Sequence, residues 1–209
     1  MEKETADECF FCNIFSKKNN GLQSLKWYDV PVLEESDFVA VPALGQIVPG
    51  YLLVAPRKHV FSIAQLNESS RKNFYGFIKQ VCKLQTELWD RPIIFEHGAC
   101  HESKKAGACI NHAHWHLVPG NWNILPPDIQ AKKLSSFGEF IEQTNKQHPY
   151  LLFVDQNTNF YLAEGDGIPS QFFRRFLAAA VGKPDEWDYL VFPFFENIKQ
   201  TLAQILDKH

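Results

Sequence analysis

The chain has 209 residues, of which 45% are hydrophobic and 14% aromatic, and its formal net charge is −3. This composition supplies a packed core and excludes a largely disordered chain, and the charge argues against binding nucleic acid through bulk electrostatics. The acidic N-terminus lacks the apolar segment of a secretory signal, and no run approaches the ~18 apolar residues of a membrane span, so we expect a cytoplasmic protein without membrane contact.

The first half of the chain reads as an antiparallel sheet followed by one long helix. Short apolar runs bounded by Asp, Glu or Pro predict strands at 25–28, 31–33, 38–41 and 51–55. Apolar residues at three- and four-residue spacing between Asn67 and Leu88 predict an amphipathic helix. A further strand is expected at 93–96, and a polar loop from Gly98 to Gly107 leads to a histidine-rich stretch.

Beyond Pro119-Gly120 the pattern changes. Pro126-Pro127-Asp128 predicts the start of a helix that runs to about Lys146. A hairpin is expected at 150–154 and 160–163, followed by a helix that Gly182 closes and a last helix at roughly 194–206.

Three histidines occupy alternate positions, as His112, His114 and His116. Alternate residues of a strand point to the same face, so we expect the three imidazoles side by side and Trp115 on the core side. Neutral imidazole acts as a nucleophile, a general acid or base, or a metal ligand near neutral pH. The pattern therefore indicates either a three-histidine zinc site that activates water, or nucleophilic catalysis by one ring.

Cys9 and Cys12 have the spacing of zinc ligands. His59, at the end of a predicted strand, and His112 are the histidines best placed to complete a tetrahedral site. Such a structural zinc site would attach the N-terminus to the histidine strand and leave the other two histidines free. Buried structural cysteines or a redox dithiol are the alternatives, but the βαβ setting of a redox dithiol is missing.

The stretch His112-Ala113-His114-Trp115-His116-Leu117-Val118 matches the signature of the histidine-triad (HIT) superfamily at every position. The Cys-x-x-Cys pair, the run at 50–59 and the long helix are also similar to that superfamily, so the resemblance covers about residues 9–119. It implies an α+β fold with a five-stranded antiparallel sheet and a long helix. It also implies a homodimer that cleaves or transfers nucleoside monophosphates at the α-phosphate.

The resemblance implies a separate role for each histidine of the triad. His114 would attack the α-phosphorus and form a covalent nucleotidyl-imidazole, with its other nitrogen held protonated by a backbone carbonyl. His116 would bind phosphate oxygens, and His112 would complete the structural zinc site. The chemistry requires no catalytic metal, because phosphoryl-type transfer depends mostly on positioning and on stabilising the equatorial oxygens.

The chain departs from the family pattern around the expected substrate. Ala43 stands where an acidic residue usually binds the ribose, and Tyr51 replaces the histidine of the usual Gly-His pair. Glu96 replaces an asparagine, and Cys109 replaces the serine of a Gln-Ser pair that borders the phosphate. We predict Glu96, Cys109 and Asn111 as substrate-binding residues, and the departures leave the identity of the substrate open.

The run Ser170-Gln171-Phe172-Phe173-Arg174-Arg175-Phe176, with Trp187 further on, is similar to the tail of CwfJ-like members, which are associated with RNA processing. We therefore predict a HIT-like catalytic domain at 1–120 and an α/β extension packed on it at 121–209. The predicted function is hydrolysis of a nucleotide conjugate, such as a dinucleoside polyphosphate or a phosphoramidate. The alternatives are a nucleotidyltransferase or phosphorylase that uses the same intermediate, and a non-catalytic module that binds nucleotide or, less favoured, RNA.

Overall fold

The strands that the structure describes form a single antiparallel sheet. The computed structural model describes residues 9, 11–12, 26–99, 112–144 and 147–208. Its eight strands lie in the order β1-β2-β3-β5-β4-β7-β8-β6, and every neighbouring pair is antiparallel. Their bounds are β1 (Leu33–Glu34), β2 (Phe38–Pro42), β3 (Leu52–Pro56), β4 (Pro92–Gly98), β5 (Trp115–Pro119), β6 (Lys132–Leu134), β7 (Tyr150–Val154) and β8 (Phe160–Glu164). The predicted number of five strands is wrong, because three strands beyond residue 119 continue the same sheet.

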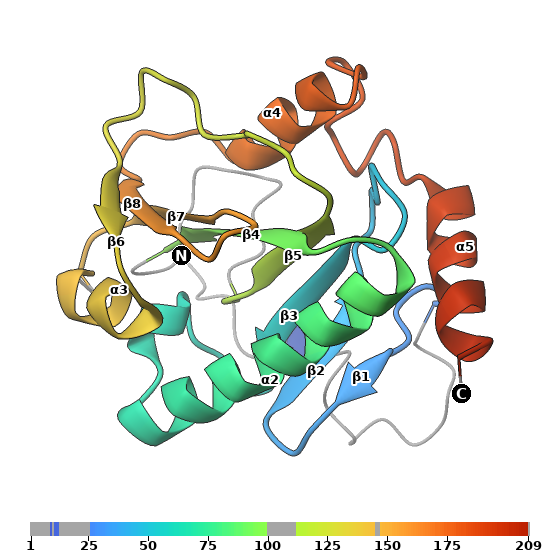
Figure 1. Cartoon of the computed structure of the whole chain (residues 1–209), viewed down its shortest axis with the longest axis horizontal. Helices are drawn as coiled ribbons and strands as arrows, with labels where there is room; N and C mark the ends of the chain where they lie inside the picture. The colour runs from blue at the N-terminus through green and yellow to red at the C-terminus, as the bar shows by residue number, and fades with distance from the viewer. Residues whose placement is uncertain (1–8, 10, 13–25, 100–111, 145–146, 209) are drawn as a thin grey trace, which may run out of the picture.

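The long helix α2 (Glu68–Leu88) confirms the predicted amphipathic helix. Asn67 begins it by accepting a hydrogen bond from the Ser70 backbone N–H at 2.8 Å, which satisfies one of the unpaired donors of the first turn. The apolar stripe, including Phe74, Phe77 and Val81, is buried against the sheet, and Figure 1 shows α2 lying across β2 and β3. The 3-10 turn η1 (Ile63–Gln65) precedes it.

The sheet has an apolar core on each face. The core on one face contains the buried stripe of α2 and Phe140 of α3 (Phe137–Gln143). The core on the other face contains Phe173 and Leu177 of α4 (Phe172–Ala180). Because successive residues of a strand point to opposite faces, Trp115 packs with the α2 core, whereas His116 points to the α4 face.

The helix predicted from Pro126 to about Lys146 is wrong. Residues 132–134 instead form the edge strand β6, which pairs with β8 and buries Leu134. The helix begins only at α3, where the Ser136 hydroxyl accepts from the Glu139 backbone N–H at 3.1 Å. The Glu139 carboxylate in turn accepts from the Ser135 backbone N–H at 2.7 Å. The capping residues at 135–139 therefore set the start of the helix, and not the two prolines upstream.

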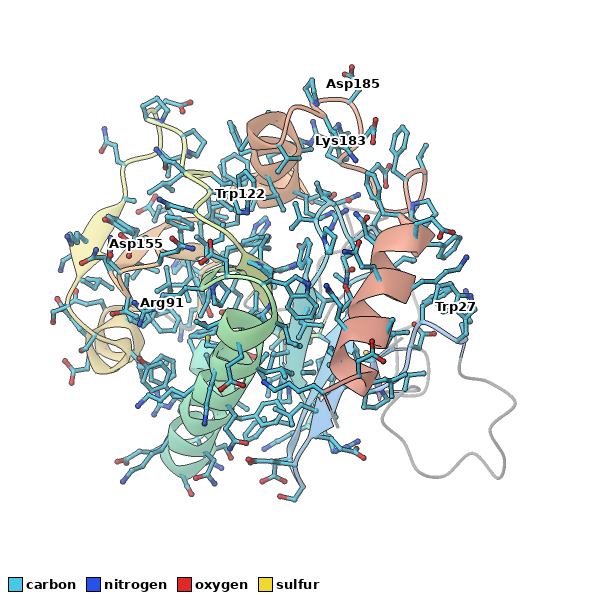
Figure 2. The ribbon with its side chains drawn as sticks, turned by 45° about the vertical axis from the view of Figure 1, so that its right-hand side comes forward. Trp27, Arg91, Trp122, Asp155, Lys183 and Asp185 are labelled. Atoms are coloured by element: carbon cyan, nitrogen blue, oxygen red, sulfur yellow. The ribbon has the colours of Figure 1, made fainter. Side chains whose placement is uncertain are left out.

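Residues beyond 120 join the sheet by strand pairing as well as by helix packing. β7 pairs with β4 along its whole length, and β5 pairs with the opposite edge of β4. The predicted hairpin of β7 and β8 is confirmed, and its turn is held by Asp155, labelled in Figure 2, which accepts from the backbone N–H groups of Asn157 and Asn159. Both edges of β4 are thus occupied within one chain.

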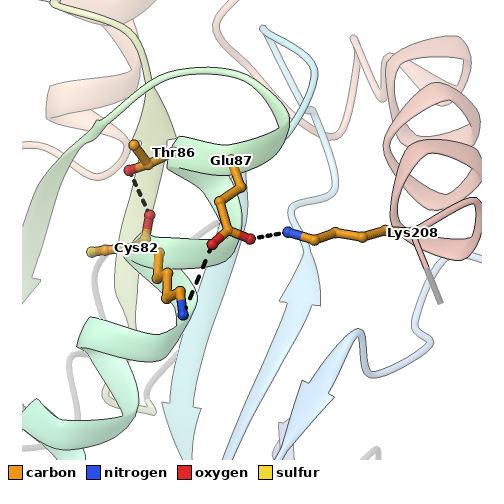
Figure 3. A network of polar contacts seen from close by, with 5 residues as sticks. Cys82, Thr86, Glu87 and Lys208 are labelled. Atoms are coloured by element: carbon orange, nitrogen blue, oxygen red, sulfur yellow. Dashed lines mark hydrogen bonds and ion pairs between the residues drawn. The ribbon is translucent and has the colours of Figure 1, made fainter.

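The last helix, α5 (Phe195–Leu206), confirms the predicted C-terminal helix and is connected to α2. Lys208 forms an ion pair with Glu87 near the end of α2, as Figure 3 shows, and Trp89 donates to Gln204. On its other side Trp27 packs against Phe195 with ring centroids 5.6 Å apart, and Figure 2 shows Trp27 beside this helix. In the part of the chain that the structure describes, no helix combines the length and apolar character needed to cross a membrane.

Candidate active site and metal centre

His114 has the hydrogen bonding of a nucleophilic imidazole. It lies just before β5, and its Nδ1 is 2.7 Å from the backbone oxygen of His112. A carbonyl oxygen only accepts, so Nδ1 must carry the proton and Nε2 keeps its lone pair. Burial lowers the pKa of this histidine, with a further decrease from the charge of His97, so the ring is neutral near pH 7. A neutral ring with a bare Nε2 is the form that can attack an electrophile.

His116 lies beside it on β5, with the two ring centroids 4.7 Å apart. In the sheet it is flanked by Leu53 of β3 and Phe95 of β4, and its ring stacks on that of Phe95 at 4.4 Å and 11°. Its Nδ1 is 2.6 Å from the hydroxyl oxygen of Tyr51. Burial lowers the pKa of His116 well below its ordinary value, and repulsion from Arg174 and from the protonated forms of His114 and His97 lowers it further. The two histidines therefore form a neutral, closely packed pair.

The remaining histidine of the triad belongs to a different cluster. His112, His59, Cys9 and Cys12 lie together, with their possible ligand atoms all within 4.8 Å of one another. The Nε2 of His112 is 2.7 Å from the backbone oxygen of Pro56, so this nitrogen carries the proton and the lone pair of Nδ1 faces the sulfurs of Cys9 and Cys12. Burial lowers the pKa of His112 to about 4, which keeps the ring in its neutral, ligating form. The structure thus brings together all four predicted ligands.

The distances within this cluster fit tetrahedral zinc. Zn–S bonds of about 2.3 Å and Zn–N bonds of about 2.0–2.1 Å place a sulfur and a nitrogen ligand about 3.6 Å apart. Cys9 Sγ lies 3.4 Å from His112 Nδ1, and Cys12 Sγ lies 3.3 Å from His59 Nδ1 and 3.6 Å from His112 Nδ1. Two sulfurs and two nitrogens at these distances are consistent with a structural zinc site, since the four ligands would close it.

Glu96 does not lie with the triad, which corrects its predicted place in the substrate site. Its side chain points to the α2 face and is 1% exposed. It accepts hydrogen bonds from the Ile63 backbone N–H at 2.9 Å, the Trp115 indole at 2.9 Å and the Tyr150 hydroxyl at 2.5 Å. Glu96 follows Phe95 on β4, so its side chain points to the opposite face of the sheet from the triad. On that face it connects β4 to β5 and β7.

This buried carboxyl gives a prediction for stability against pH. Burial raises the pKa of Glu96 from 4.5 to about 7, although the three hydrogen bonds favour the charged form. The unfolded chain releases this proton near pH 4.5 and the folded chain only near pH 7, so Glu96 lowers the free energy of unfolding as pH rises between those values. The loss is about 3 kcal/mol across this window.

The Glu96→Gln variant has no proton to release and is expected to lack this loss. Denaturant unfolding from pH 4 to pH 8 gives the free energy of unfolding of wild type and variant. The value for the variant minus the value for wild type is expected to rise by about 3 kcal/mol as pH rises. The other titrating groups contribute equally to both proteins, so their effect cancels when the two free energies are subtracted. Glu164→Gln, at an exposed position of β8, is the matched control. Parallel curves for wild type and Glu96→Gln would contradict the prediction.

Of the other predicted substrate residues, Cys109 and Asn111 lie outside the described residues. Three residues that sequence reasoning did not assign to the site contact the triad or adjoin it. Phe11 packs against both His112 and His114, with ring centroids 5.4 Å apart in each case. Tyr51 contacts His116, and Arg174 of α4 lies over the Tyr51 ring at 5.7 Å. The replacement of histidine by Tyr51 was the one signal in the sequence that could have pointed to this contact.

The fold and site together define an α+β protein with a paired-histidine site next to a Cys2His2 cluster. Residues 26–123 match the HIT domain family, to which the histidine alternation was already similar. The chain is 23% identical over 114 residues to "Protein hit" of Bacillus subtilis (strain 168), covering 54% of this chain and 72% of that protein.

Several solved structures resemble the chain. A hypothetical histidine triad nucleotide-binding protein from Sulfolobus tokodaii strain7 is 24% identical, with a TM-score of 0.42 and coverage of 64% of this chain and 85% of that one. A HIT family hydrolase from Clostridium thermocellum is 20% identical, with a TM-score of 0.43 and coverage of 60% and 100%. A Zn-bound histidine triad family protein from Mycobacterium smegmatis is 21% identical, with a TM-score of 0.40 and coverage of 55% and 76%.

Proposed function

We propose that this chain is a nucleotide hydrolase that acts on the α-phosphate of a nucleotide conjugate through a covalent nucleotidyl-His114. The observation that carries the proposal is the 2.7 Å hydrogen bond from His114 Nδ1 to the backbone oxygen of His112. It leaves Nε2 as the reactive nitrogen, on a ring that is separate from the candidate zinc ligands. The match of residues 26–123 to the HIT domain supports the same reaction class.

The chemistry divides into two displacements. In the first, His114 Nε2 attacks the α-phosphorus, an N–P bond forms, and the bond from phosphorus to the leaving group breaks with its electron pair. A phosphate leaving group departs as its anion, whereas an amine leaving group takes up a proton from solvent. The imidazole, which is still protonated on Nδ1, becomes cationic. In the second, water attacks the phosphorus, loses a proton, and displaces the neutral imidazole to release the nucleoside monophosphate. Imidazole lowers the barrier because it is both a good nucleophile and a good leaving group.

The residues around His114 would serve positioning and charge stabilisation. His116 is 4.7 Å away by ring centroid and could donate a hydrogen bond to a phosphate oxygen. Phe95 and Phe11 pack against the two rings and limit their rotation. A zinc ion would be held by four side chains, Cys9, Cys12, His59 and His112. It would connect the two cysteines to the two histidines and take part in no step of the reaction.

The test is to trap the intermediate. The protein is mixed with diadenosine and diguanosine polyphosphates and with adenosine and guanosine phosphoramidates carrying a label on the α-phosphate, and quenched in alkali because N–P bonds are labile to acid. A nucleoside monophosphate adduct mapped by mass spectrometry to His114 is expected. Absence of any adduct and of turnover across the panel would reject the proposal.

The same adduct separates hydrolysis from the alternative transferase or phosphorylase reaction. The trapped intermediate is chased with water alone, with inorganic phosphate or with a sugar phosphate. Release of monophosphate at the same rate in all three favours hydrolysis, whereas a nucleoside diphosphate or nucleotide sugar as product favours transfer. The homodimer, an RNA partner, the CwfJ-like tail, the cytoplasmic location and the division at residue 120 stay predictions.

A further inference from the structure

Tyr51 is placed to act on His116 from the neighbouring strand. It lies just before β3, two residues before Leu53, which pairs with His116 in the sheet. Residues two apart on a strand share a face, so the Tyr51 ring reaches His116 diagonally. The ring is fully buried, and its hydroxyl oxygen is 2.6 Å from His116 Nδ1. This is a short hydrogen bond whose direction depends on which atom holds the proton.

The proton of the Tyr51 hydroxyl determines that direction. Burial raises the pKa of Tyr51 to about 12, so the hydroxyl keeps its single proton near neutral pH. Among the described residues His116 Nδ1 is the hydrogen-bond partner of this hydroxyl, and it is the atom that can accept the proton. The guanidinium of Arg174 lies over the Tyr51 ring at 5.7 Å, and its positive charge disfavours a second positive charge on His116, which keeps that ring neutral. The Nδ1 atom therefore accepts, and the neutral ring carries its proton on Nε2.

The two neighbouring histidines thus hold opposite tautomers. In His114 the backbone oxygen of His112 fixes the proton on Nδ1 and leaves Nε2 bare. In His116 the Tyr51 hydroxyl fixes the proton on Nε2. A nucleophile and a hydrogen-bond donor then stand side by side, with ring centroids 4.7 Å apart. This combination suits an attack on phosphorus in which a phosphate oxygen gains charge.

We propose that Tyr51, which lies next to Arg174 of α4, is a positioning residue that fixes His116 as the Nε2–H donor next to the nucleophile. The catalytic role of this His116 tautomer rests on the proposed function, whereas the tautomer itself does not. In this arrangement the segment beyond residue 120 contributes to the site through Arg174.

Arg174 is built into the fold and has little freedom to move. Its side chain is 4% exposed, its Nη2 donates to the Gly45 backbone oxygen at 2.7 Å, and its Nε donates to the Trp187 backbone oxygen at 3.1 Å. Gly45 has φ +71°, and a Cβ there would lie 2.5 Å from Arg174 Nη2 and 2.4 Å from Tyr189 Cβ. Glycine at this position therefore allows both the turn and the close approach of the guanidinium.

The decisive experiment reads the proton positions directly. Long-range ¹H–¹⁵N correlation of the histidine rings in the purified full chain distinguishes a protonated from a bare nitrogen, with signals assigned through His116→Asn and His114→Asn. We expect wild-type His116 to carry its proton on Nε2, and Tyr51→Phe to shift it toward a mixture of both tautomers. Tyr150→Phe is the matched control, because it removes the hydroxyl of a buried tyrosine that contacts Glu96 on the opposite face.

Turnover of adenosine 5′-phosphoramidate gives the second readout. Tyr51→Phe is expected to lower kcat roughly 10- to 100-fold and to change KM less than about threefold, because a misplaced proton removes a donor used in the transition state. Tyr150→Phe is expected to lower thermal stability without changing the His116 tautomer. A wild-type His116 with its proton on Nδ1, or a tautomer that does not respond to Tyr51→Phe, would overturn the inference. Absence of wild-type turnover with the expected tautomer would reject the proposed function alone.

Discussion

Replacing His114 with alanine is expected to lower kcat by roughly 10⁴-fold or more, because the variant loses the atom that forms the bond to phosphorus. The residual rate would come from binding and from the donor on His116. The effect should appear in kcat rather than in KM, since the bare Nε2 acts only once the substrate is bound. Steady-state turnover of the best panel substrate, together with the yield of the covalent adduct, measures both consequences.

The control for this variant is another histidine of the same chain. His148→Ala removes an exposed ring that forms an ion pair with Asp166 at 3.6 Å, and it should retain wild-type turnover. His116→Ala should still form the adduct but more slowly, by roughly 10²- to 10³-fold, because it removes one donor to the developing charge. If His114→Ala gave the wild-type rate and a labelled protein, the nucleophile would have to be another residue.

The parts of the site that could be predicted from the sequence are those that depend on short spacing. Cys9 and Cys12 are separated as zinc ligands require, and the structure brings them to His59 and His112 as expected. The alternation of histidines predicted a shared face, and this holds for the closely packed His114 and His116 pair. His112 differs, because β5 begins only at Trp115 and the His112 ring turns to the cysteines.

The parts that could not be predicted depend on contacts between distant segments. Arg174 is 123 residues after Tyr51, and one of two adjacent arginines on a helix commonly faces water. Only the packing of α4 on the triad face makes Arg174 a buried neighbour of the site. The place of Glu96 could not be predicted for the same reason. A glutamate at the end of a predicted strand gives no sign in the sequence of its buried partners Trp115 and Tyr150.

The extra strands have a similar explanation. The hairpin of β7 and β8 was expected from its own apolar runs and turn, but local pattern does not tell which edge a hairpin will join. β7 pairs with β4 over five residue pairs, and this pairing hides an edge that would otherwise be open to another chain. The sheet therefore has eight strands where the resemblance implied five.

Zinc removal is the second change for which we expect a large effect. The cluster connects Cys9 and Cys12 to His59, which follows β3, and to His112, which precedes β5, so its loss frees the two cysteines from the sheet. Structural zinc contributes about 10–16 kcal/mol in peptides that have no other core. Here two apolar cores remain, so we expect a smaller loss of several kcal/mol, which corresponds to a fall in Tm of roughly 10 °C.

Cys9→Ser and Cys12→Ser are expected to lose bound zinc, whereas His114→Ala should retain it, because the His114 ring is not among the candidate ligands. Cys82→Ser is the matched control, since this cysteine is on α2 and outside the cluster. Metal content by mass spectrometry and thermal unfolding with and without a chelator measure both effects. Because Phe11 packs against His114, loss of zinc should also slow formation of the His114 adduct. Zinc that is lost in His114→Ala and kept in Cys9→Ser would instead place the metal on the triad and make the reaction one of metal-bound water.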